Sequence, residues 1–101
     1  MKIIKPIQIW DNGKLKEAKI LNAYATNVVL NNSANFYYSL YTETSEGILG
    51  EQLREGNIIM EGENYQLWQQ DSEAWGFIAS TLNLIIIDDF MPYIEPNIEK
   101  I

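Results

Sequence analysis

Pairs of carboxylates are the side chains of this sequence best suited to catalysis. The pairs are Glu61 with Glu63, Asp71 with Glu73, and Asp88 with Asp89. Glycosidases use two such acids, held about 5–10 Å apart across a substrate cleft. All of these pairs fall at expected turns and helix starts, and a chain of 101 residues has little material for a cleft. We therefore expect a protein without enzymatic activity.

The chain contains no histidine and no cysteine. Without cysteine it has no thiolate nucleophile, disulfide or cysteine-ligated zinc. Without histidine it has neither the usual general base near neutral pH nor the commonest metal ligand. The acidic residues also do not follow the spacing of an EF-hand loop. We expect no cofactor and no metal site.

Charge is unevenly distributed along the chain. Residues 1–19 carry five lysines and two acids, a net charge of +3, whereas residues 20–101 carry two basic and twelve acidic residues, a net charge of −10. The acidic part would repel phosphate, so we expect no direct binding to nucleic acid. No apolar run approaches the roughly 18 residues of a membrane span, and we expect no membrane insertion. Two explanations stay open: an acidic surface that aids solubility, or a basic edge that meets an acidic neighbour.

The first part of the chain has the pattern of β-strands. Asn12-Gly13 predicts a tight hairpin turn, because both residues tolerate positive φ. Pro6 has no backbone donor, which favours an edge position or a strand entry. Residues 35–42 form the clearest strand, and its alternation predicts one core-facing set. That set is Phe36, Tyr38 and Leu40.

Two segments around this strand have ambiguous patterns. Residues 17–29 alternate on both faces, which predicts one face with Ile20, Tyr24 and Val28 and another with Leu21, Ala23, Ala25 and Val29. The return segment after the turn at residues 43–47 is interrupted by Gly50 and Gly56. These glycines predict either a bulge or two short strands.

After Gly62 the spacing of apolar residues changes to that of a helix. One helix would align Tyr65, Trp68, Ser72, Trp75, Ala79 and Leu82. The alternative is a break at Asp71 and Ser72, since both are favoured N-caps. Either arrangement predicts helical structure near 63–70 and near 72–82. Residues 84–87 then predict a buried strand that ends at Asp88.

The aromatic residues divide into two groups. Tyr65, Trp68 and Trp75 have helical spacing, which favours core packing over an exposed platform for sugars or bases. Trp10, Tyr37 and Tyr41 lie on strand faces that we expect to be exposed. Tryptophan and tyrosine are enriched in protein interfaces, so these residues are candidate contacts with a partner.

The segment 90–101 combines two prolines with large apolar side chains. Ordering its backbone costs about 1–2 kcal/mol per residue, which its apolar burial would only offset in a preformed groove. That groove belongs either to its own domain or to another subunit. We predict a globular domain at residues 1–89 and an extended arm at 90–101. The candidate contacts of the arm are Phe90, Met91, Tyr93, Ile94 and Ile98.

These patterns together predict an α+β fold. We expect a small antiparallel sheet or sandwich packed against one or two short helices in the C-terminal half. An extended C-terminal arm would complete it.

Residues 35–84 resemble small structural proteins of tailed-bacteriophage virions. The resemblance rests on the aromatic strand NFYYSLYTE, the strand GNIIMEG, and the segments ENYQLWQQD and AWGFIASTLNL. It implies a multicopy virion protein attached to a capsid, head fibre or tail. It also implies other virion proteins as partners, and we expect a homo-oligomer.

The sequence therefore favours two functions. The first is a non-catalytic virion accessory protein that docks through protein–protein contacts. The alternative is a small acidic inhibitor, of the immunity or anti-defence type, that masks a basic site on an enzyme. A ligand-binding module is a third possibility, and it requires Trp68 and Trp75 to be solvent-accessible.

Overall fold

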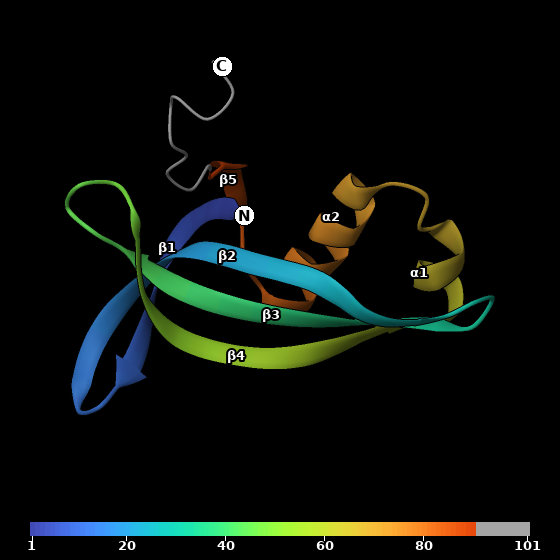
Figure 1. The fold of residues 1–101 in the computed structure, drawn as a ribbon, viewed down its shortest axis with the longest axis horizontal. Coiled ribbons are helices and arrows are strands. Elements are labelled where there is room, and N and C mark those ends of the chain that lie inside the picture. Colours follow the sequence, from blue (N-terminus) through green and yellow to red (C-terminus); the bar gives the residue numbers. More distant parts are fainter. Residues whose placement is uncertain (91–101) are drawn as a thin grey trace, which may run out of the picture.

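A computed structural model describes residues 1–90 of the chain. Five antiparallel strands form one sheet in the order β4-β3-β2-β1-β5 (Figure 1). The strands are β1 (Lys2–Asp11), β2 (Lys14–Val29), β3 (Ser33–Glu43), β4 (Leu49–Glu61) and β5 (Ile86–Asp89). The helices α1 (Gly62–Leu67) and α2 (Asp71–Leu82) connect β4 to β5. The predicted antiparallel sheet with two short helices is confirmed.

The turn between β1 and β2 has the predicted conformation. Asn12 and Gly13 have φ values of 50° and 77°, which suit the tight turn that antiparallel strands favour. Pro6 lies within a register irregularity between Ile3 and Ile7. Only Lys2, Ile3 and Ile4 of β1 pair with β5. Pro6 lies after them, so its lack of a backbone N–H removes no hydrogen bond between β1 and β5.

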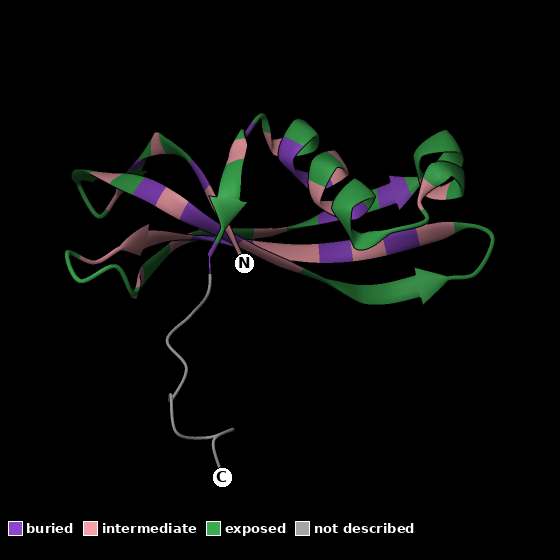
Figure 2. Cartoon of the chain, turned by 90° about the horizontal axis from the view of Figure 1, so that it is seen from above, coloured by how far each residue is buried: buried purple, intermediate pink, exposed green. Residues whose placement is uncertain are grey.

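The main core lies between the sheet and α2. Phe36 and Leu40 of β3 are each 3% exposed, and they pack in one cluster with Leu21 of β2 and Ile78 of α2. Tyr38 packs against the same cluster and is half-buried. The predicted core-facing set of β3 is therefore confirmed. Figure 2 shows both helices on the same side of the sheet.

A bulge changes the face of the last residues of β2. Ala25 pairs with Phe36 and Asn27 pairs with Asn35, so Thr26 is an extra residue between them. Its Oγ1 donates to the carbonyl oxygen of Asn35 over 3.3 Å. Because one inserted residue reverses the alternation, Val28 shares the helix-covered face of Ala25 and not the face of Tyr24. The predicted grouping of Ile20, Tyr24 and Val28 is wrong for this reason.

β4 is one strand with irregular register near Gly50, where the predicted bulge is confirmed, whereas the pairing around Gly56 is regular. Gly50 lies against the backbone of Thr42, and Gly56 lies against the ring of Tyr38. The register of β3 against β4 shifts on both sides of Tyr41. These glycines permit close approach of neighbouring groups to the strand.

The helical region contains two helices separated at residues 68–70, and the predicted alternative with a break is confirmed. The residue that caps α2 differs from the prediction, which favoured Asp71 or Ser72. Gln70 is the N-cap, and it forms a capping box with Glu73. The Glu73 carboxylate accepts hydrogen bonds from the amides of Gln69 and Gln70 at 2.6 and 2.8 Å. The acid three residues after the cap thus satisfies donors that the helix leaves unpaired.

The last strand is shorter and more exposed than predicted. β5 begins at Ile86, and Ile85 and Ile87 are each 60% exposed because β5 is an edge strand without a second layer over it. Of the predicted buried strand at 84–87, Leu84 is buried at 8% exposure but precedes the strand, and Ile86 is in the strand but only half-buried. Phe90 is 5% exposed and donates its N–H to the carbonyl oxygen of Met1 over 3.0 Å. Phe90 therefore packs with the folded domain, and the prediction that places it in the arm is wrong.

Alanine substitutions at two glycines should have opposite effects on stability. A Cβ at Gly50 would lie 2.8 Å from the carbonyl oxygen of Thr42, so Gly50→Ala must move backbone. We expect it to lower the free energy of unfolding by about 1–3 kcal/mol.

Gly76 in α2 has open space around it, and Gly76→Ala should raise the free energy of unfolding by about 0.5–1 kcal/mol, because alanine has a higher helix propensity than glycine. Urea unfolding followed by circular dichroism measures both, and an unchanged midpoint for Gly50→Ala would contradict the close approach.

Candidate protein-interaction surface

The face of the sheet opposite the helices carries a group of aromatic and amide side chains. Alternation along β3 places Asn35 and Tyr37 on this face. Tyr37 lies opposite Tyr24 of β2 on one side and opposite Asn57 of β4 on the other. The rings of Tyr24 and Tyr37 are tilted against each other, with centroids 5.4 Å apart. Ile59 lies opposite Asn35 and extends the surface along β4.

We call this group the open face, defined by Tyr24, Asn35, Tyr37, Asn57 and Ile59. Tyr24 is 54% exposed and Ile59 is 57% exposed. Tyr37 is half-buried by its neighbours. Large apolar groups that remain accessible beside amides are typical of protein interfaces.

A hydrogen bond holds Tyr37 in place on the open face. Its hydroxyl donates to the carboxylate of Glu55 in the neighbouring strand β4. This hydrogen bond to Glu55, with partial desolvation, raises the pKa of Tyr37 to about 12. The phenol therefore stays protonated throughout the physiological range, and its ring keeps a fixed position between Tyr24 and Glu55.

Tyr41 belongs to the same face but packs more internally. It lies opposite Ile20, which is completely buried. Ser39 is 1% exposed and donates its hydroxyl proton to the Tyr41 hydroxyl oxygen over 3.0 Å. Tyr41 is thus half-buried and covers Ile20 on this side of the sheet.

Trp10 lies far from the two tyrosines. It pairs with Leu15 near the turn of the β1–β2 hairpin, and these side chains are 68% and 60% exposed. Along β2, Leu15 is separated from Tyr24 by nine residues, or about 30 Å of extended strand. Trp10, Tyr37 and Tyr41 were predicted as exposed contacts, but they do not form one continuous surface. Only Trp10 is strongly exposed.

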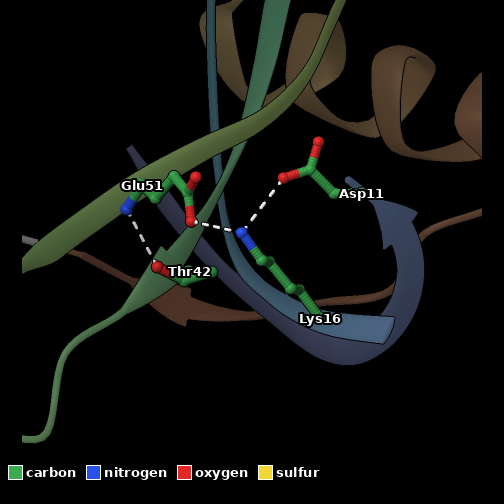
Figure 3. A network of polar contacts seen from close by, with 4 residues as sticks. All are labelled: Asp11, Lys16, Thr42 and Glu51. Atoms are coloured by element: carbon green, nitrogen blue, oxygen red, sulfur yellow. Dashed lines mark hydrogen bonds and ion pairs between the residues drawn. The ribbon is translucent and has the colours of Figure 1, made fainter. Parts of the chain in front are cut away.

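An ion-pair network joins the β1–β2 hairpin to β4. The Lys16 ammonium lies 3.1 Å from Asp11 and 2.9 Å from Glu51, and the Glu51 amide donates to Thr42 Oγ1 over 2.9 Å (Figure 3). The hydrogen bonds with Glu51 and Asp11 raise the pKa of Lys16. Lys2 forms a further pair with Asp89 and lowers the pKa of that carboxyl group. Much of the N-terminal basic charge is therefore matched within the chain.

Trp68 and Trp75 pack against the core, as their spacing predicted. Trp68 meets Phe36 edge to face, with centroids 5.5 Å apart, and meets Tyr65 in the same way at 6.2 Å. The Tyr65 hydroxyl accepts the Asn31 amide proton over 3.1 Å, which fixes α1 to the β2–β3 turn. The Lys2 ammonium lies 5.4 Å from the ring centroid of Trp75. Both indoles are half-buried, and a ligand-binding platform required them to be exposed.

The carboxylate pairs do not converge on a cleft. A cavity of about 350 Å³ between α1 and α2 contains one of these acids, Glu73, whose carboxylate is engaged by backbone amides. Asp88 accepts the Asp89 amide proton over 2.7 Å. Within residues 1–90, no group of three or more acidic side chains is arranged to hold a metal ion. In the same part of the chain, no helix is long and apolar enough to cross a membrane.

Sequence reasoning missed Tyr24 and Ile59 as surface residues. Their exposure depends on pairing across strands, Tyr24 with Tyr37 and Ile59 with Asn35. In the sequence, this exposure was indicated only for Tyr24, by the apolar residues that occur on both faces of residues 17–29. The predicted contacts Met91, Tyr93, Ile94 and Ile98 lie outside the residues that the structure describes.

No protein-family model, curated protein or solved structure matches this chain. The resemblance to phage virion proteins therefore stays a prediction from the sequence pattern. The function has to be proposed from the geometry of the surfaces.

The pairing of Tyr37 with Glu55 should be visible in an alkaline titration. The difference in ultraviolet absorbance between the wild type and Tyr37→Phe should titrate at about pH 12, against an ordinary value of 10.0. Glu55→Gln should move this transition back toward 10, because the neutral amide no longer favours the protonated phenol.

The same shift has a consequence for stability. The folded protein retains a proton that the unfolded chain releases above pH 10, so this contribution is complete below pH 10 and is lost as the pH approaches 12. Stability curves of wild type and Glu55→Gln should therefore converge in this interval. Identical titrations of the two proteins would show that the carboxylate does not act on Tyr37.

Proposed function

We propose that this protein is a non-catalytic structural subunit that docks onto neighbouring protein subunits through the open face. The observation that carries the proposal is that the helices cover one side of the sheet, while the other presents Tyr24, Tyr37 and Ile59. Virion assembly is the setting that the sequence resemblance favours, with other virion proteins and further copies of this chain as partners.

The chemistry of the open face suits a protein partner. Tyr24 and Tyr37 supply rigid rings with few rotatable bonds, so ordering them on binding costs little conformational entropy. Asn57, opposite Tyr37 on β4, and Asn35, two residues before Tyr37 on β3, supply donors and acceptors that can meet a partner's backbone. Ile59 adds an apolar contact that association would remove from water.

The arrangement of charge supports docking to a like subunit more than masking of a strongly basic enzyme. Of the two carboxylates of β4 beside the open face, Glu55 is engaged by Tyr37, while the exposed Glu61 lies opposite Ser33 beyond Ile59. An inhibitor of a basic site would gain from several unpaired carboxylates gathered on one face. The alternative inhibitor function predicts a monomer that forms a salt-sensitive one-to-one complex with a basic protein.

Native mass spectrometry of the full chain tests the proposal. We expect homo-oligomers at micromolar concentration, and Ile59→Lys should raise their dissociation constant by about tenfold or more, because the ammonium would be buried against apolar groups. Leu67→Lys is the matched control. Leu67 is 62% exposed and lies in α1 on the other side of the sheet, so this variant should associate like the wild type.

Circular dichroism must show that both lysine variants are folded. A wild type that remains monomeric at high concentration would overturn the proposal of self-association through the open face. So would two lysine variants that weaken association equally, since that result would not distinguish the open face from the helical side.

A further inference from the structure

The outer edge of β2 is unpaired over the last part of the strand. β1 pairs with β2 only as far as Leu21, which lies opposite Lys2. Within residues 1–90, residues 23–29 of β2 pair with β3 alone. We call residues 23–29 the β2 edge, and Figure 2 shows its exposed end along one margin of the sheet. Such an edge offers amide and carbonyl groups with which another strand can pair.

The β2 edge lacks the charges that usually protect a strand edge from other chains. Its sequence, AYATNVV, contains no charged residue and no proline. The bulge at Thr26 interrupts the edge at one point, and the residues on both sides of it keep their pairing with β3. The opposite edge of the sheet, β4, carries Glu51, Arg54 and Glu55. Because charged side chains discourage edge-to-edge pairing, the two edges are protected very differently.

The distribution of charge favours a second copy of this chain as the partner of the β2 edge. Each copy has a formal net charge of −7, so two copies repel each other wherever their acidic surfaces meet. The β2 edge is uncharged, and two such edges can pair without placing like charges opposite each other. A strand that pairs with its own copy in antiparallel orientation also forms a closed twofold dimer, which leaves no further edge at that place.

We propose that two copies join their β2 edges in antiparallel orientation, so that their two sheets become one continuous sheet. Residues that lie opposite each other on paired strands share a face of the sheet, and this requirement selects the register. The bulge at Thr26 leaves Ala23, Ala25 and Val28 on the helix-covered side of β2. With Ala25 opposite Ala25 of the second copy, Ala23 lies opposite Val28 of the second copy, and both pairs share a face. This register uses residues 23–28 of both copies.

The same register fills a groove beside α2. A cavity of about 310 Å³ lies between β2 and α2, and its walls include Ala23, Ala25, Trp75 and Ile78. The two alanines are small, so the helix-covered side of β2 leaves space there. Val28 is 41% exposed in the single chain. Next to Ala23 of the second copy, its side chain would enter this space and lose contact with water.

This pairing goes beyond docking through the open face. Tyr24 would lie opposite Asn27 of the second copy, on the side of the sheet that carries the open face. The two open faces would therefore continue into each other across the joint. Ile59 lies on β4, which is separated from β2 by β3, so it does not take part in the joint. Edge pairing and docking through the open face are separate contacts, and each can be tested without the other.

Disulfide trapping in the full chain tests the proposal, since the chain contains no cysteine. Ala25→Cys places two thiols opposite each other, and they should form an intermolecular disulfide at least about tenfold faster than the thiols of Ala23→Cys. Ala23 is the matched control, because it is the same residue type on the same face and its two copies would lie about 13 Å apart along the joined strands. Each rate is divided by the reactivity of that thiol toward a small disulfide reagent. Equal normalised rates would overturn the proposal.

A mixture of two single variants tests the register. Ala23→Cys and Val28→Cys should cross-link to each other at least about tenfold faster than either cross-links to itself, because only the mixed pair lies opposite in the joined strands. Non-reducing electrophoresis and mass spectrometry of the intact protein distinguish the mixed dimer from the two homodimers. Homodimers that form as fast as the mixed dimer would contradict this register, and a complete absence of cross-links at micromolar concentration would overturn the pairing of two copies.

Ile59→Lys separates edge pairing from docking through the open face. Added to Ala25→Cys, it should change the rate of disulfide formation by less than about twofold, because distant sites act independently. Edge-paired dimers would then persist although docking through the open face is weakened. A disulfide that is lost together with that docking would show that the copies meet through the open face, and edge pairing would be overturned.

Hydrogen exchange supplies a measurement without cysteines. Raising the concentration of the wild-type chain about a hundredfold should increase the protection of alternate amides in residues 23–28 by at least about tenfold, because every second N–H points to the outer edge. β4 is the control, and its amides should exchange at a rate that does not depend on concentration. Exchange in residues 23–28 that is equally independent of concentration would contradict the joined sheet.

Discussion

The fold depends on how a small helical layer covers a long sheet. α2 has 12 residues and is therefore about 18 Å long, whereas β2 has 16 residues and spans about 53 Å. One such helix covers only the central part of one face, where Leu21, Phe36 and Ile78 form the main core. Everything outside that area must be buried by the sheet itself or stay exposed.

The two ends of the sheet respond to this constraint differently. At one end, buried residues lie on the face of the sheet that the helices do not cover. They are Ile9 of β1 and Ala18 and Ile20 of β2. There the bulged pairing around Tyr41 and the bridge from Lys16 to Glu51 bring β4 toward the β1–β2 hairpin. At the other end no such closure occurs among the described residues, and the end of β2 and the turn after it carry exposed Val28, Val29 and Leu30.

Local signals in the sequence predicted local structure well. Asn12-Gly13 specified its turn because few residue pairs accept two positive φ values, and Phe36 to Leu40 specified a core face because their alternation is regular. The sequence did not reveal the bulge at Thr26, since an extra residue has no signature until its partner strand is known. The same limit hid the open face, which exists only through the pairing of β2, β3 and β4. The burial of Phe90 likewise depends on Met1, at the other end of the described chain.

The pairing of the last strand with the first has a consequence for the order of folding. The hairpins from β1 to β4 join strands that are neighbours in the sequence, so they can form while the chain is still being synthesised. The contact between Lys2 and Asp89 closes a loop of 87 residues, and it can form only after β5 has emerged from the ribosome. Until then the nascent chain would carry β1 as a second uncovered edge. A chain that is interrupted before β5 would therefore retain the uncovered edge of β1 that native folding removes.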